Sequence, residues 1–112
     1  MNYVDSGDPD YSLKVRKVTP VQNIGIEDLT INRYPSEQAA SSVNNIQFLF
    51  AVNCWVKGVE SYKASGSHLD INRSSHIEVS GCYFHEAEHY GDGGWGYGVV
   101  TYGSTTNRLI EN

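Results

Sequence analysis

Hydrophobic and polar residues alternate along most of this chain in short runs, which is the pattern of β-strands. Runs rich in Ile, Val, Leu, Phe and Tyr are separated by Gly, Asn and Ser. Proline occurs at Pro9, Pro20 and Pro35, so nearly all of the chain after Pro35 is free to pair in sheets. One short helix is predicted over residues 36–42, with Ser36 as its N-cap. The pattern therefore predicts an all-β fold.

The strand runs repeat along the chain. Four segments, "NIGIEDLTI", "NCWVKGVES", "HIEVSGCYF" and "NRLIEN", align with one another, and a polar turn separates the two strands of each repeat. Two short strands in a repeat of roughly 20–30 residues are typical of a β-solenoid, whose coils bury their apolar sides by stacking. The aligned columns are Ile26, Val56, Val79 and Ile110; Leu29, Val59 and Cys82; Ile46, Leu69 and Val100; and Phe48, Ile71 and Tyr102.

A β-sandwich is the alternative fold for this pattern. Sandwiches contain regular hairpins, and the two-residue Asn-Gly or Asp-Gly turns that mark hairpins are missing between the strands of a repeat. The spacing therefore favours the β-solenoid. We expect residues 1–19 to form an acidic, polar lead-in segment and residues 20–112 to form the coils of one domain.

Charge and cysteine content narrow the class of protein. The chain has 112 residues, with 8 Lys and Arg against 13 Asp and Glu, and its net charge of −5 argues against a nucleic-acid partner. An anionic polysaccharide stays open, because a few local cations can line a groove on an acidic protein. No run approaches the roughly 20 apolar residues of a membrane helix. Cys54 and Cys82 fall in different columns, so we expect free thiols and no disulfide.

A family resemblance adds to this reading. The stretch "VESYKASGSHLDINRSSHIEVSGCYFHEA", followed by "GDGGWGYGV" and "NRLIEN", resembles the pectin-lyase-like superfamily, and more narrowly bacterial β-helix repeat proteins. The resemblance implies a single-stranded right-handed parallel β-helix of about four coils, part of a longer solenoid that is extracellular or on the cell surface. Such families include lyases, hydrolases, epimerases and non-catalytic adhesins. Their first sheet lines the substrate groove; here it would comprise residues 45–50, 68–72 and 97–102.

Candidate site residues follow from alternation along this first sheet. If Leu69 and Ile71 point inward, His68 and Asp70 point to solvent two residues apart. Residues 85–96 should leave the coil as a loop that overhangs this row, although its glycines also suit a sharp turn without function. The catalytic candidates are therefore His68, Asp70, Arg73, His85, His89 and Tyr97, and the substrate-binding candidates are Gln47, Asp92 and Trp95.

The side chains available slightly favour elimination or epimerisation over hydrolysis. Removing a proton beside a uronate carboxylate needs a base, a proton donor and a cation. His68 or His89, Tyr97 and Arg73 supply these three roles. Hydrolysis needs two carboxyl groups, and the column of Asp70 offers no second acid. A carbohydrate-active β-helix that binds or cleaves a polysaccharide is thus the leading hypothesis.

Two further expectations concern cofactors and the rival class of function. We expect no metal: "HEAEH" supplies two histidines but no full zinc site. Calcium is the one alternative, with Asp70, Glu86, Glu88 and Asp92 as oxygen ligands. The rival function is a non-catalytic solenoid used as a surface, adhesin or structural module. An enzyme would bring the candidate residues into one groove, whereas a structural solenoid would leave them scattered or paired with one another.

Overall fold

The computed structural model describes residues 17–33, 43–88 and 95–111, and within these ranges the protein is all-β. The predicted helix over 36–42 and most of the lead-in segment lie outside the described residues. None of the described residues forms a helix that could cross a membrane. The strands are β1 (Val21–Gln22), β2 (Gly25–Glu27), β3 (Thr30–Asn32), β4 (Ile46–Leu49), β5 (Ala51–Lys57), β6 (Glu60–Ala64), β7 (Ser67–Asn72), β8 (Ser75–Ser80), β9 (Tyr83–Ala87), β10 (Tyr97–Tyr102) and β11 (Thr106–Glu111).

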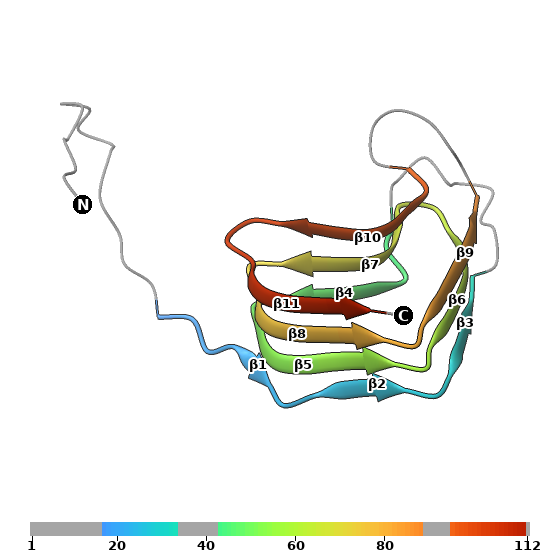
Figure 1. Cartoon of the computed structure of the whole chain (residues 1–112). Helices are drawn as coiled ribbons and strands as arrows, with labels where there is room; N and C mark the ends of the chain where they lie inside the picture. The colour runs from blue at the N-terminus through green and yellow to red at the C-terminus, as the bar shows by residue number, and fades with distance from the viewer. Residues whose placement is uncertain (1–16, 34–42, 89–94, 112) are drawn as a thin grey trace, which may run out of the picture.

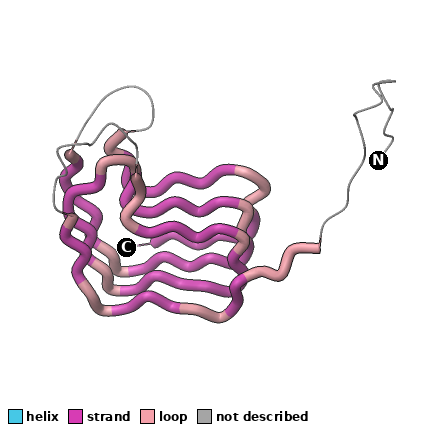
Figure 2. The backbone as a smooth tube through the Cα atoms, turned by 180° about the vertical axis from the view of Figure 1, so that it is seen from behind, coloured by secondary structure: helices cyan, strands magenta, loops and turns pink. Residues whose placement is uncertain are grey.

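The strands form three sheets that the chain visits in turn (Figure 1). The β5 sheet holds β1 and β2 beside β5, followed by β8 and β11; the β6 sheet holds β3, β6 and β9; and the β7 sheet, the predicted first sheet, holds β4, β7 and β10. Every pairing is parallel. Figure 2 shows the strands layered one above another with loops at the corners. This arrangement is consistent with the predicted β-solenoid.

The predicted columns are largely confirmed. In the β5 sheet, Ile26 lies beside Val56, Val56 beside Val79, and Val79 beside Ile110. In the β7 sheet, Ile46 lies beside Leu69. Val56, Val79, Ile46 and Leu69 are the buried members of these columns, and complete burial of an aliphatic side chain stabilises the fold by about 1.5–3 kcal/mol; Ile26 is partly buried and Ile110 is exposed. The buried core residues are Ile46, Phe48, Ala51, Cys54, Val56, Val59, Leu69, Ile71, Ile77 and Val79.

The predicted register of β10 is wrong by one residue. Val99, rather than Val100, lies beside Leu69. The cause is the turn after β10, residues 103–105, which is one residue longer than the turn between β7 and β8. Because side chains alternate, this extra residue moves Tyr102 from its predicted core position to an exposed one.

Residues with a positive φ recur at equivalent positions in successive coils. This conformation suits Gly and is tolerated by Asn and Asp, whereas other side chains adopt it at a cost. The columns of Phe50 and Asp28 lie between strands, where the chain passes from one sheet to the next, whereas most members of the other two columns lie within strands. The columns are Asn23, Asn53, His76 and Asn107; Phe50, Arg73 and Gly103; Asp28, Gly58 and Gly81; and Lys63 and Glu86.

Candidate functional site

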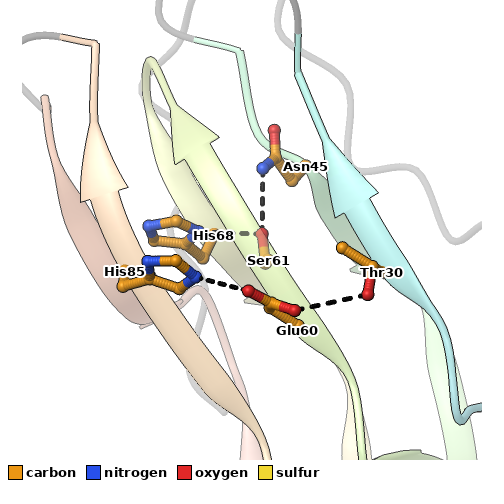
Figure 3. Close-up of polar contacts among 6 residues, drawn as sticks. All are labelled: Thr30, Asn45, Glu60, Ser61, His68 and His85. Atoms are coloured by element: carbon orange, nitrogen blue, oxygen red, sulfur yellow. Dashed lines mark hydrogen bonds and ion pairs between the residues drawn. The ribbon is translucent and has the colours of Figure 1, made fainter.

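His68 is buried, so the prediction that it faces solvent is wrong. It is 3% exposed, although it lies on the opposite face of β7 from Leu69. The turn between β6 and β7 is two residues long, which brings the start of β7 against the end of β6. The Nδ1 atom of His68 lies 2.8 Å from the Oγ atom of Ser61, and its ring stacks on Phe84 with 5.6 Å between centroids and 5° between planes (Figure 3 shows the Ser61 contact).

A chain of hydrogen bonds connects Asn45, Ser61 and His68 (Figure 3). The Nδ2 atom of Asn45 donates to Ser61 Oγ at 2.9 Å. Ser61 Oγ can donate to Nδ1 of His68 when that nitrogen is unprotonated, or accept from it through its second lone pair when it is protonated. Burial lowers the pKa of His68; a hydrogen bond with the backbone of Glu86 opposes this shift, and the nearby His85 adds to it. His68 is thus a neutral ring held by its neighbours.

The Ser61–His68 pair has the spacing of a nucleophile and its base, but not the access. Nucleophilic catalysis requires such a hydrogen bond. It also requires the substrate to come within about 3–3.5 Å of the nucleophile, and Ser61 is 0% exposed. In this structure the pair instead holds β6 against β7.

Asp70 is also buried, at 1% exposed, so the prediction that it faces solvent is wrong as well. Its Oδ2 atom accepts three hydrogen bonds, from Asn44 Nδ2 at 2.8 Å, Gln47 Nε2 at 3.0 Å and the Tyr102 hydroxyl at 2.8 Å. The pKa of Tyr102 is raised, chiefly by the hydrogen bond that its hydroxyl donates to Asp70. Gln47, a predicted substrate-binding residue, therefore ties β4 to the carboxylate of β7.

Three of the remaining candidates, Arg73, Tyr97 and Trp95, lie within the described residues. Arg73 occupies a corner position and its guanidinium covers the ring of Phe50, 5.6 Å from the ring centroid. Tyr97 opens β10 and is 47% exposed. Trp95 is half-buried just before β10. His89 and Asp92 lie outside the described residues.

No metal centre is assembled from the part of the chain that the structure describes, because no group of three or more His, Cys, Asp or Glu side chains is placed to hold an ion. Of the calcium candidates, Asp70 has three donors on one oxygen. Glu86 is exposed, and Glu88 lies 4.0 Å from the Nε atom of Arg33. Asp92 lies outside the described residues.

The outer face of the β6 sheet carries a feature that the sequence reasoning missed. Tyr83 is 63% exposed and its ring stacks nearly parallel on that of His85, with 4.1 Å between centroids and 11° between planes. The ring of Tyr62, on the neighbouring strand, lies 5.1 Å from that of His85. We call Tyr62, Tyr83, His85 and the adjoining Glu60 the aromatic ledge.

Polar groups surround the aromatic ledge. The Nε2 atom of His85 lies 2.8 Å from Oε1 of Glu60, and Thr30 donates to the other oxygen of Glu60 at 3.4 Å (Figure 3). The ammonium group of Lys63 lies 5.0 Å from the centroid of the Tyr62 ring. The ledge thus combines flat rings with a carboxylate, an imidazole, a hydroxyl and a cation.

The sequence contained a signal for this ledge. Tyr83 and His85 are two residues apart, and they alternate with Cys82 and Phe84, which pack against the core. The prediction that residues 85–96 form an excursion is wrong at its start, because β9 continues to Ala87. His85 is therefore an outward strand residue, not part of a loop.

Comparison with known proteins finds no match among protein-family models, curated proteins or solved structures. The function therefore has to be inferred from the arrangement of these residues.

Proposed function

We propose that this protein is a parallel β-helix module that binds a polysaccharide on its aromatic ledge without cleaving it. The observation that carries the proposal is the exposed ring of Tyr83 stacked on His85, with Glu60 beside it. A sugar ring has an apolar face of C–H groups and an edge of hydroxyls. Aromatic rings with adjacent hydrogen-bonding groups suit both, because aromatic side chains offer a large apolar surface and carboxylates accept strongly.

Burial of the best catalytic candidates supports binding rather than cleavage. His68 and Asp70 are engaged by neighbouring side chains and almost wholly removed from solvent. General acid–base catalysis needs a side chain within hydrogen-bond reach of the substrate proton. Two of the candidates, Gln47 and Asp70, are hydrogen-bonded to one another, and such pairing is expected of the rival, non-catalytic module. The proposed module therefore presents a surface and performs no reaction.

The proposal extends to the finer architecture. A right-handed β-helix of about four coils, similar to the pectin-lyase-like superfamily, is supported by the strong preference of parallel crossover connections for the right hand. An extracellular or cell-surface location follows from the same resemblance and from a polysaccharide ligand.

The test compares Tyr83→Ala with Tyr97→Ala. Both tyrosines are exposed, Tyr83 on strand β9 of the β6 sheet and Tyr97 on strand β10 of the β7 sheet, so each is the matched control of the other. Calorimetric titration of the unaltered protein against a panel of neutral and acidic polysaccharides identifies a ligand first. We expect Tyr83→Ala to weaken binding about tenfold, equivalent to about 1.4 kcal/mol, and Tyr97→Ala to leave it unchanged.

Other outcomes would contradict the proposal in distinct ways. If only Tyr97→Ala lost polysaccharide binding, the binding surface would lie on the predicted first sheet and not on the aromatic ledge. Unsaturated products or new reducing ends in the ligand solution would show that the protein is an enzyme. Absence of binding across the panel would remove the proposed function.

A further inference from the structure

We propose that His68 makes strand β9 acid-sensitive, so that the aromatic ledge loosens in mildly acidic solution. The effect on polysaccharide affinity rests on the proposed function, but the loosening of β9 does not. The proposal stands on where His68 lies: it comes from β7, it is buried, and it contacts β6 through Ser61 and β9 through Phe84. One titratable ring therefore joins the three strands behind the ledge.

Protonation of His68 would leave the hydroxyl hydrogen of Ser61 without this acceptor. Ser61 accepts from Asn45, and it can donate to Nδ1 of His68 only while Nδ1 is unprotonated. Once Nδ1 carries a proton, Ser61 Oγ accepts from both neighbours, and its own hydrogen has to find another acceptor in a fully buried position. The new charge would also lie in a nearly solvent-free position, where an unpaired ion is strongly disfavoured.

The surrounding charged groups do not offset this cost. On β9, His85 repels a charged His68, and the side chain of Glu86 is exposed while its backbone bonds to His68. On β6, the Oε1 atom of Glu60 is held by His85. On β7 itself, Asp70 accepts its hydrogen bonds from other donors.

The direction of the pH effect follows from linkage. Burial lowers the pKa of His68 in the closed structure, whereas a solvent-exposed ring titrates near 6.5. The open form therefore binds more protons than the closed form once the pH falls below about 6.5. The population of the open form then rises by up to about tenfold for each pH unit, until the closed form also becomes protonated. Above this range the opening is independent of His68.

Opening of β9 would disturb the aromatic ledge, because Tyr83 and His85 lie on the same strand as Phe84, which contacts His68. Phe84 lies between Tyr83 and His85 in sequence and points to the opposite face. When His68 leaves the ring of Phe84 and the backbone of Glu86, the strand that carries the two ledge rings loses its support from behind. Polysaccharide affinity should therefore fall together with the protection of β9.

The decisive measurement is amide hydrogen exchange of β9 in the free protein between pH 7.5 and 5.0, corrected for the intrinsic pH dependence of exchange. We expect the opening of residues 83–87 to increase by up to tenfold per pH unit below about 6.5, while β8 stays protected. In His68→Asn the side-chain oxygen can still accept from Ser61 but cannot titrate, so its opening should not change with pH. His85→Asn removes the other histidine of this region and should keep the dependence, over a narrower pH range because His85 no longer helps to lower the pKa of His68.

Each alternative result overturns the proposal. If the opening of β9 in the unaltered protein does not change with pH, the proposal is contradicted. This test needs no variant, so it holds even if His68→Asn fails to fold. The same pH dependence in His68→Asn, or its loss in His85→Asn alone, assigns the sensor elsewhere. Titration of an identified polysaccharide at pH 7.5 and 5.5 then tests the coupling: exchange that responds while no polysaccharide binds would contradict the proposed function and leave the acid sensitivity in place.

Discussion

Replacing Asp70 by alanine should destabilise the protein by about 2–4 kcal/mol. Three donors, two from the segment around β4 and one from β10, converge on its Oδ2 atom. A hydrogen bond to a charged group contributes about 1.5–3 kcal/mol when both partners stay buried. Gln47 and Tyr102 are exposed and can turn to water, so their loss should cost little, whereas Asn44 is half-buried and loses a partner it cannot fully replace.

Asp70→Asn is the matched control because it keeps the shape and one acceptor oxygen. The amide would place its NH2 group where Oδ1 now lies, a buried atom with no hydrogen-bond partner among the described residues. Loss of the charge weakens three bonds, while the desolvation of a carboxylate is relieved. We expect a smaller loss of about 1 kcal/mol from these opposing terms. The pKa of Tyr102 should also fall back toward its usual value, because its bond to a charged acceptor raises it.

Urea unfolding followed by circular dichroism measures both variants, and a ring resonance of Tyr102 followed by NMR reports its titration. A loss below about 1 kcal/mol in Asp70→Ala would refute the reasoning, because the carboxylate would then not hold the β7 sheet together. An unchanged titration of Tyr102 in Asp70→Asn would show that the bond between them is not formed in solution.

Three further predictions concern other parts of the fold. Gly25→Ala should cost about 1–3 kcal/mol and change tryptophan fluorescence, because a Cβ would come within 2.0 Å of the Trp55 indole; an unchanged spectrum would contradict this. Arg73→Gly should be neutral or stabilising by up to about 1 kcal/mol in urea unfolding, since φ is +48° there. A clear loss of stability would contradict this and show that the contact of Arg73 with the Phe50 ring outweighs the backbone strain. Thiol titration of unfolded, unreduced protein should find Cys54 and Cys82 both free. A titration that detects no reactive thiol would refute this prediction.

The core could be predicted from the sequence because its signal is local. Ile26, Val56 and Val79 occupy the same place in successive repeats, and apolar alternation alone places them inward. The register of β10 could not be predicted, because Val99 and Val100 are both apolar and either fits the column. The length of the following turn decides between them, and that turn has no pattern of its own.

The candidate site was harder to predict because burial depends on neighbouring strands. Alternation correctly placed His68 opposite Leu69, but the two-residue turn before β7 lays other strands over that face. Aromatic and acidic residues on β6 and β9 form the ledge only once the strands are in register. The proposed roles of His89 and Asp92 stay predictions.

The parallel pairing of the three sheets has a consequence for how the chain folds. The neighbour of each strand lies one whole circuit away in sequence, as Val56 and Val79 illustrate, so no two adjacent strands can zip from a hairpin. Each pairing must first close a long loop, which slows folding. Once β5 and β8 are together, however, their free edges template the strands on either side. We expect a slow nucleation event in the middle of the chain, followed by rapid growth toward both ends.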